Sequence, residues 1–352
     1  MRRQTLCFAL TLFLAGLANA SFAQDALSPL ALARMKAEYK RPAPRPVENT
    51  ALVDLGRLLF WDTRISASGT TSCQSCHHPH LGWAVTDKFS RNDSGKLTSR
   101  RSQPLIGLGH AAEGSVFGWD GRNVSLEAQA KGSVATGSMS MRETDTPVKV
   151  EVIEARIRVI PDYADRFAKA LPGKPITLDN IATAIAAYER TIEPGPAPFD
   201  RWVAGEEGAI SEAAKRGFAV FNGKANCSAC HSGWRFTDDK FHDIGTTTSD
   251  RGRGREVKDD PLLQFAFKTP TLRWVAQRAP YMHDGSSATL ADVVAHYVTG
   301  GIDRPSRSPM IMPLDLSAQE QADLVAFMQT LTGSPEGEPA PNLPAAAPVP
   351  KL

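Results

Sequence analysis

Two parts of the chain repeat the same pattern of apolar and polar positions. Gly56–Phe60 and Gly217–Phe221 each place a glycine four residues before a phenylalanine. Further along, Ile185–Ile192 matches Leu324–Leu331, again with apolar residues at helical spacing. Because a glycine lets two helices cross closely, the pattern predicts a duplicated unit in which an early helix packs beside a closing helix.

Proline-rich segments indicate where the two units end. Glu193–Asp200 (EPGPAPFD) is typical of a linker, so we expect an N-terminal domain over residues 24–195 and a C-terminal domain over residues 196–333. Residues 334–352 are rich in proline and alanine and lack a core-forming pattern, which predicts a flexible tail. The fold is therefore expected to be mostly α, with long loops rich in Gly, Ser and Thr.

The N-terminus is typical of an export signal. Two arginines precede the apolar run Thr5–Ala18, the small residues Ala18 and Ala20 offer a cleavage site, and a second candidate cut follows Ala23. Residues 1–23 are therefore expected to be removed. An uncleaved membrane anchor is the alternative, but the run is shorter than a membrane span. We therefore expect a periplasmic protein that has no membrane attachment after cleavage.

Removal of this segment changes the net charge. The full chain has 40 Lys and Arg against 38 Asp and Glu, and residues 1–23 contain two arginines and no acid, which leaves 38 of each. A neutral mature chain gives no support to nucleic-acid binding. With 42% apolar and 22% charged residues, the composition is that of a soluble globular protein.

Four of the five cysteines lie in two C-x-x-C-H motifs, and the fifth, Cys7, lies in the export signal. Two cysteines three apart on a helical turn can each bond to a vinyl group of one haem, and the next residue, His, can ligate the iron. Zinc is the main alternative, but a His directly after a Cys cannot easily turn onto the same ion. A thioredoxin-type redox pair would need a βαβ setting, which is absent.

The motifs therefore predict two covalently bound haem c groups and two cytochrome c-like haem domains with long loops. The expected attachment residues and proximal ligands are Cys73, Cys76 and His77 for the first haem, and Cys227, Cys230 and His231 for the second.

With two haem units in this order, the chain resembles the bacterial di-haem cytochrome c peroxidase and MauG family. The resemblance is carried by Leu55–His77, Gly118–Ala130, Phe267–Leu290 and the C-terminal closing helix, in the family's order, up to about residue 332. It implies that the N-terminal haem is the site of hydrogen peroxide. The C-terminal haem, six-coordinate in the family, would store or relay an electron.

The resemblance also implies a distal catalytic glutamate after the Asp120-Gly121-Arg122 stretch, at Glu127. Peroxide must pass a proton from its near to its far oxygen before the O–O bond breaks, and a carboxylate above the iron can take and return that proton. The alternative is a solvated glutamate on the helix Leu126–Ala130, which is the commoner fate of an isolated Glu.

The distal ligand of the second haem separates the family's subgroups, because its peroxidases use Met and MauG uses Tyr. The matching position is Tyr297. Its helical spacing from Leu290, Val293 and Val294 by itself favours a packed core tyrosine. A phenolate ligand would lower the iron potential and make this haem a store of oxidising equivalents. Met282 is the second choice, and the other candidates are His283, His296, Met310 and Met312.

Two positions depart from the family pattern. Some peroxidases place a removable His ligand where this chain has Asp93, so the peroxide site is expected to be open without prior reduction. Other histidines that could cap it are His78, His80 and His110. The family often places a Trp between the haems, yet the matching region Pro104–Gly107 has none. Trp83, Trp119 and Trp274 are the other bridging candidates, each also suited to a packed core.

The family binds calcium between its domains, and the resemblance places possible ligands at Asn92, Arg278 and Pro280, the latter two by their carbonyl oxygens. An Asn in a polar loop is more often a turn residue.

Three functions are consistent with these features. The first is a MauG-like enzyme that uses hydrogen peroxide to form a high-valent di-haem state, which oxidises Trp or Tyr side chains of a partner protein. The second is a cytochrome c peroxidase that reduces peroxide to water with electrons from a small cytochrome c or cupredoxin. The third is a non-enzymatic di-haem electron carrier. Glu127 and the long loops count against the third, whereas Tyr297 and Asp93 favour the first.

Overall fold

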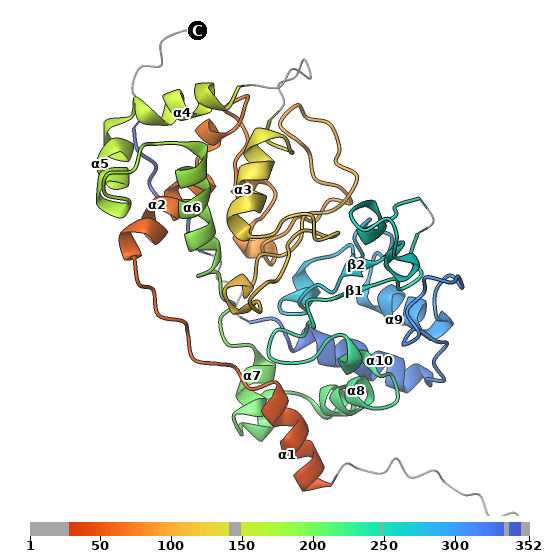
Figure 1. Cartoon of the computed structure of the whole chain (residues 1–352). Coiled ribbons are helices and arrows are strands. Elements are labelled where there is room, and N and C mark those ends of the chain that lie inside the picture. Colours follow the sequence, from red (N-terminus) through yellow and green to blue (C-terminus); the bar gives the residue numbers. More distant parts are fainter. Residues whose placement is uncertain (1–27, 141–148, 248, 334–337, 346–352) are drawn as a thin grey trace, which may run out of the picture.

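The computed structural model describes residues 28–140, 149–247, 249–333 and 338–345; the expected export signal, residues 1–23, lies outside them. The described chain is mostly α-helical with long loops, as expected (Figure 1). Among these residues, no helix combines the length and apolar character needed to cross a membrane. The α-helices are α1 (Pro29–Glu38), α2 (Thr50–Trp61), α3 (Leu126–Ala135), α4 (Val150–Arg158), α5 (Pro161–Ala170), α6 (Leu178–Glu189), α7 (Pro198–Val203), α8 (Glu212–Asn222), α9 (Leu290–Thr299) and α10 (Ala318–Gln329).

Each domain is built on a pair of crossing helices, α2 with α6 and α8 with α10 (Figure 1). A Cβ atom added to Gly56 would lie 1.8 Å from the carbonyl oxygen of Ala184, and one added to Gly217 would lie 1.9 Å from that of Asp323. Both glycines therefore sit where one helix backbone touches the other, and any side chain would force the helices apart. This confirms the duplicated unit that the sequence pattern predicted.

Local sequence signals begin these helices. The Asn49 side chain accepts a hydrogen bond from the amide of Leu52 and starts α2. Ser317 and Glu320 cap one another's backbone amides at the start of α10. Caps of this kind stabilise a helix by about 1 kcal/mol each. Each helix also buries an apolar face, with Leu55 and Leu59 in α2 and Leu324 and Phe327 in α10, so burial of apolar surface supplies the larger part of their stability.

Each domain has its own apolar core with edge-to-face aromatic contacts. In the first core, the Phe60 ring packs against Trp83 and Tyr188 with centroids 5.9 and 5.3 Å away. In the second core, Phe221 and Phe327 are 5.0 Å apart. Edge-to-face contacts of this length stabilise a core beyond the burial of area alone.

The N-terminal segment differs from the expected domain boundary. Residues 24–195 were expected to form the first domain, but α1 and the following Tyr39 pack in the second core, beside α7 (Figure 1). Tyr39 is fully buried, its ring is stacked on Phe236 at 4.7 Å, and its hydroxyl donates to Asn222. A buried aromatic ring with a satisfied hydroxyl holds this segment on the second domain.

Part of the C-terminal segment also differs from the expected flexible tail. Residues 338–345 lie against the first domain, where the Glu338 carboxylate pairs with Arg57 of α2 and accepts a hydrogen bond from Tyr188 of α6. Arg57 also donates to the carbonyl of Pro339, and Arg64 to that of Pro344. Arginine side chains therefore hold a segment that has no apolar pattern of its own.

Loops from both domains meet between the two cores. The short antiparallel strands β1 (Phe241–His242) and β2 (Phe267–Lys268) pair Phe241 with Lys268, and lie on the side facing the first domain (Figure 1). Across this boundary, the Arg100 guanidinium bonds to the carboxylates of both Asp120 and Asp250. Such pairs, with side chains that are largely buried, fix the loops that form the cavities described next.

Candidate functional site

Each C-x-x-C-H motif forms one short helical turn after the first helix of its unit. Cys73–Ser75 and Cys227–Ala229 are 3₁₀ turns, and the amides of His77 and His231 donate to the carbonyls of Cys73 and Cys227 at 3.0 and 2.9 Å. In the second motif Cys227, Cys230 and His231 all line one cavity, and in the first motif His77 lines the other. The helical turn keeps the two cysteines of each motif close to its histidine, as attachment of one haem requires.

Both motif histidines are oriented in the same way. The Nδ1 atom of His77 lies 3.1 Å from the carbonyl oxygen of Trp83, and that of His231 lies 2.8 Å from the carbonyl oxygen of Phe236. A proton on Nδ1 leaves the Nε2 lone pair free for a metal. Burial lowers the pKa of His77 to about 4 and also lowers that of His231, so both imidazoles are neutral, the form that ligates iron.

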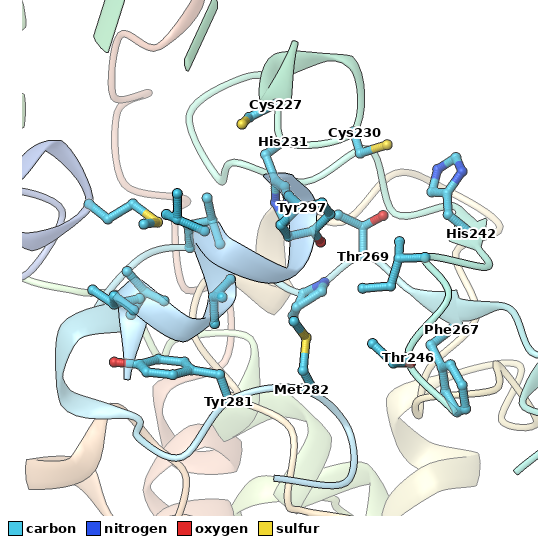
Figure 2. Close-up of a pocket in the computed structure, with 18 of the residues that line it drawn as sticks. Cys227, Cys230, His231, His242, Thr246, Phe267, Thr269, Tyr281, Met282 and Tyr297 are labelled. Atoms are coloured by element: carbon cyan, nitrogen blue, oxygen red, sulfur yellow. The ribbon is translucent and has the colours of Figure 1, made fainter. Parts of the chain in front are cut away.

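The second cavity lies beside His231 and has a volume of about 210 Å³. Its wall is mainly apolar and includes residues of α9 and α10, and Tyr281, Met282 and Tyr297 also line it (Figure 2). An apolar cavity closed at one edge by two thiols and an imidazole fits a haem.

Two buried arginines in the wall of the second cavity also suit a bound haem. The Nη1 atom of Arg101 is buried without a hydrogen-bond partner, and Arg278 is buried and donates one bond to the carbonyl of Thr271. Burial lowers the pKa of Arg278 to about 9. Among the described residues, no carboxylate forms an ion pair with either guanidinium. The carboxylates of a haem would supply the missing charge.

The structure narrows the candidates for the distal ligand of the second haem. Tyr297 lines the cavity together with Met282, His283, Met310 and Met312. His296 does not line it, and its Nε2 atom lies 2.8 Å from the carbonyl oxygen of Ile244. Met310 and Met312 are exposed, and the His283 ring is stacked on Phe267 at 3.6 Å. Tyr297 and Met282 therefore remain the two main candidates.

The first cavity lies beside His77 and has a similar volume of about 210 Å³. Residues 268–271 of the second domain complete its wall. Within the described part of the chain, His77 is the one histidine that lines this cavity. The other histidines considered as caps lie elsewhere: His78 is bonded to Gln74, His110 is paired with Glu193, and His80 is exposed.

Asp93, at the position of the removable ligand, does not line the first cavity either. Its carboxylate accepts bonds from the amide and the hydroxyl of Ser68 at 2.7 and 2.5 Å. The residue is buried and holds a loop, so in the described part of the chain neither Asp93 nor a second histidine lines the first cavity.

Glu127 lies on the first turn of α3, but it is not among the residues lining the first cavity. Its carboxylate is 2.8 Å from Arg190, and about a third of its side chain is exposed. Burial alone would raise its pKa, but hydrogen bonds from Arg190 and the local backbone outweigh burial and lower the pKa. Glu127 is thus ionised at neutral pH.

Two polar side chains that the sequence did not single out do line the first cavity near α3. Asn123 precedes the helix, and Gln129 lies one turn beyond Ser125 on the helix face that also carries Leu126. The S-L-E-A-Q-A stretch contains Gln129, but only the helix direction shows which of its side chains face the cavity.

One tryptophan of the three bridging candidates lines both cavities. Trp119 is in the wall of each, with its Nε1 atom donating to the carbonyl of Arg101 at 2.8 Å. Trp83 and Trp274 belong to the first apolar core. Trp119 is therefore the tryptophan best placed between two bound haems.

A buried carboxyl group near the first motif was not expected from the sequence. Glu189, near the end of α6, is only 3% exposed, and its Oε2 atom has no hydrogen-bond partner. Burial raises its pKa to about 8, opposed by Arg190. Glu189 is therefore protonated at neutral pH beside the ionised Glu127–Arg190 pair.

Two of the three possible calcium ligands already accept hydrogen bonds. The Oδ1 atom of Asn92 accepts bonds from the amide of Lys96 and the hydroxyl of Ser94 at 2.8 and 2.9 Å, which is a local turn. The carbonyl oxygen of Arg278 accepts from the guanidinium of Arg101, while Pro280 lines the second cavity. A buried guanidinium therefore lies against one of these carbonyls, and calcium binding at the three positions stays a prediction.

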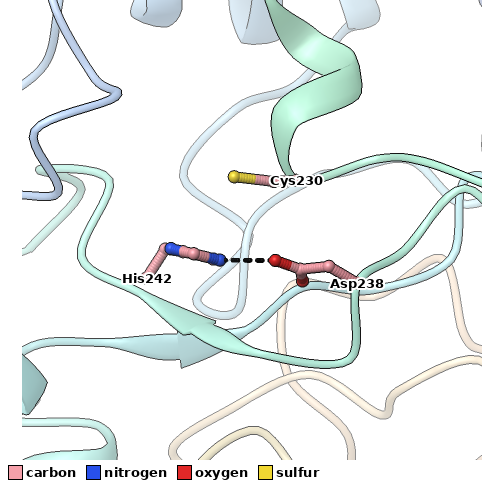
Figure 3. A group of neighbouring side chains, drawn as sticks. All are labelled: Cys230, Asp238 and His242. Atoms are coloured by element: carbon pink, nitrogen blue, oxygen red, sulfur yellow. Dashed lines mark hydrogen bonds and ion pairs between the residues drawn. The ribbon is translucent and has the colours of Figure 1, made fainter. Parts of the chain in front are cut away.

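Cys230, Asp238 and His242 also gather beside the second cavity (Figure 3). Asp238 and His242 form an ion pair at 2.8 Å, which together with Cys230 raises the pKa of His242 to about 9. Attachment of haem would convert the Cys230 thiol to a thioether and remove it as a metal ligand. The cluster therefore belongs to the haem site.

Comparisons with known proteins agree with this geometry. A family model described as di-haem cytochrome c peroxidase matches residues 50–208, and one described as cytochrome c matches residues 214–332. The chain is 43% identical to the methylamine utilization protein MauG of Methylorubrum extorquens, over 89% of this chain and 88% of that protein. It is 32% identical to the cytochrome c551 peroxidase of Nitrosomonas europaea, over 84% of each chain.

A solved structure of a MauG-like protein associated with microbial copper homeostasis is 31% identical, with a TM-score of 0.73, covering 84% of this chain and 94% of that one. The fold similarity to that structure and the two family matches each support the same assignment, and together they cover nearly the whole described chain. This chain belongs to the di-haem cytochrome c peroxidase and MauG family of haem-dependent oxidoreductases.

Proposed function

We propose that the protein is a periplasmic di-haem peroxidase of the MauG type, which uses hydrogen peroxide to oxidise tryptophan or tyrosine side chains of a partner protein. The observation that carries the proposal is the contrast between the two cavities. His77 is the one histidine lining the first cavity among the described residues, whereas Tyr297 lines the second. An open first iron and a phenolate on the second favour storage of oxidising equivalents over rapid electron uptake from a donor.

The haem irons, when bound, supply the centres that exchange electrons with peroxide. The chain would hold them through Nε2 of His77 and His231, whose Nδ1 atoms face carbonyl oxygens, and through the four motif cysteines, which we propose form covalent thioether bonds. Asn123 and Gln129 can hydrogen-bond peroxide in the first cavity. Glu127 is the proposed base that accepts the peroxide proton, which requires its carboxylate to leave Arg190 and turn towards the cavity.

Trp119 is proposed to couple the two centres, because its ring lies in the wall of both cavities and its Nε1 proton is held by the carbonyl of Arg101. A fixed aromatic ring between the two cavities can carry an electron from one haem site to the other, which a saturated side chain does less readily.

The second candidate function is a cytochrome c peroxidase that takes electrons from a small cytochrome c or cupredoxin. It is favoured by one observation, the presence of Met282 on the wall of the second cavity (Figure 2). A thioether ligand would raise the potential of the second iron and let it accept electrons from such a donor.

Rapid mixing of the diferric protein with hydrogen peroxide separates the two functions. For the MauG type, we expect both haem spectra to change without prior reduction, and the oxidised state to persist for seconds or longer and to be only slowly reduced by a cytochrome. A matched sample reduced by one electron is the control. If only that sample reacts, and then turns over rapidly with the cytochrome, the second function is correct.

The number and linkage of the haems have a direct test. Because the two motifs use every cysteine other than Cys7, the purified protein is expected to show a mass gain of two haems that survives denaturation. Changing both Cys76 and Cys230 to alanine should abolish this gain, and Cys7→Ala should preserve it. A single haem, or bound zinc, would contradict the assignment.

A further inference from the structure

An aromatic pair lies directly behind the iron ligand of the first cavity. The carbonyl of Trp83 accepts the hydrogen bond of His77, and the Trp83 ring packs against the ring of Tyr188 with centroids 6.3 Å apart. Both side chains are buried, at 7% and 1% exposure. Two easily oxidised rings thus run from the proximal side of the first haem site into the domain core.

The hydrogen-bond partner of the Tyr188 hydroxyl is a carboxylate. It donates to Oε2 of Glu338 at 2.6 Å, and the other carboxylate oxygen of Glu338 pairs with Arg57. The Glu338 side chain is about a third exposed, so this carboxylate lies between the buried phenol and the solvent. A phenol can lose an electron in a buried place when a nearby base takes its proton, because the product is then a neutral radical.

The second domain supplies an internal comparison. Phe236 occupies the place of Trp83, since its carbonyl accepts the hydrogen bond of His231, and Phe327 occupies the place of Tyr188 in the repeated closing helix. Their rings are 6.1 Å apart, so the geometry is kept while both rings are ones that resist oxidation. The oxidisable pair is confined to the domain whose cavity is open for peroxide.

The second domain does contain a buried tyrosine, but its partner differs. Tyr39 is stacked on Phe236, and its hydroxyl donates to the side-chain carbonyl of Asn222 at 2.7 Å. A carboxamide accepts a hydrogen bond but cannot take up a proton at neutral pH. The Tyr188 hydroxyl differs, because it donates to the carboxylate of Glu338, which can take up the proton.

We propose that Trp83 and Tyr188 form an internal oxidation path from the first haem site, with Tyr188 as its redox-active end and Glu338 as its proton acceptor. Hydrogen peroxide, the oxidant of the proposed function on which this inference rests, is reduced to water and leaves two oxidising equivalents on the protein. One electron passes from Tyr188 through Trp83 to the first haem site and consumes one of these two equivalents, while the other stays at the haem sites. At the same time the O–H bond of Tyr188 breaks, its proton goes to the Glu338 carboxylate, and a neutral tyrosyl radical remains.

The experiment uses the complete haem-loaded protein, freeze-quenched at intervals after mixing with hydrogen peroxide and examined by electron paramagnetic resonance. We expect a narrow organic-radical signal that grows as the oxidised haem spectrum decays. Incorporation of ring-deuterated tyrosine should narrow its hyperfine pattern and so assign it to tyrosine. Peptide mass spectrometry after repeated peroxide exposure should find added oxygen or cross-links at Tyr188 or Trp83.

Tyr188→Phe keeps the ring packing and is expected to abolish the radical signal and lengthen the life of the oxidised haem state. Tyr39→Phe, which removes an equally buried hydroxyl, is the matched control and should leave the signal unchanged. Glu338→Gln keeps a hydrogen-bond acceptor but removes the base, so the radical should form more slowly and with a lower yield. Unchanged haem absorption before peroxide is added would show that each variant is folded.

The outcomes separate this inference from the proposed function. If peroxide leaves the haem spectra of the diferric protein unchanged, the proposed function fails. If the haem spectra change normally but the radical signal is absent, or persists in Tyr188→Phe, the oxidation path is overturned while the proposed function stands. A signal that is equally fast and intense in Glu338→Gln would remove Glu338 as the proton acceptor.

Discussion

Replacing Glu127 with glutamine is expected to slow the reaction of hydrogen peroxide with the diferric protein by about 10²–10⁴, the usual contribution of a positioned acid–base group. The reason is that glutamine cannot take the proton from the near oxygen of peroxide. Both haem spectra should be unchanged before mixing, because Glu127 is partly exposed and makes no core contact. The measurement is the observed rate constant in rapid-mixing absorption experiments over a range of peroxide concentrations.

The pH profile gives this prediction a second readout. Because the pKa of Glu127 is lowered, the group stays ionised down to acidic pH, so the wild-type rate should be flat through neutral pH and fall only in acid. The glutamine variant should lack this acid limb. Glu212→Gln, which changes an exposed glutamate paired with Lys215 in the second domain, is the control and should react like the wild type.

The ion pair with Arg190 holds the Glu127 carboxylate away from the first cavity. Glu127 is bound to Arg190 in the structure, and Asn123 and Gln129 occupy the cavity wall instead. If Glu127 acts by turning inward, Arg190→Gln should preserve or increase the rate. An equal rate in Glu127→Gln and wild type would remove Glu127 from the mechanism and direct attention to the side chains that line the cavity.

Tyr297→Phe is expected to change the coordination of the second iron. If the phenolate is its distal ligand, the resting ferric protein has one high-spin and one low-spin iron, and the variant should lose the low-spin signal or replace it with that of a weaker ligand such as water. Loss of an anionic ligand should also raise the reduction potential of this haem. Electron paramagnetic resonance and a redox titration measure the two effects.

Met282→Leu is the matched variant, because Met282 lines the same cavity and is the other main candidate ligand. It should leave both the spectrum and the potential of the second haem unchanged. The reverse result, an altered Met282→Leu and an unaltered Tyr297→Phe, would assign the thioether as ligand. That outcome would favour the cytochrome c peroxidase function over the MauG type.

Covalent chemistry and helix periodicity could be predicted from local sequence because each depends on residues close together in the chain. The C-x-x-C-H spacing predicts haem attachment through the reach of one helical turn, and the repeated glycine-to-phenylalanine spacing predicted the two helix crossings. The structure shows both crossings at Gly56 and Gly217. Tyr297, Met282 and His283 line one cavity. His296 does not line it, and its Nε2 atom is instead hydrogen-bonded to the carbonyl oxygen of Ile244, which is distant in the sequence.

Contacts between distant segments could not be predicted from local sequence spacing, because they depend on which surfaces meet after folding. Tyr39 packs in the second core although it lies near the N-terminus, and Glu338 returns to the first domain although its segment lacks any apolar pattern. Trp119 lines both cavities only because loops of the two domains close around it. The two haem-binding units and their order follow from the amino-acid sequence alone, because short-range spacing sets them. The side chains that face each cavity, and the partner of each buried polar group, could be identified only from the folded chain. Burial and hydrogen bonding depend on neighbours that are far away in the sequence.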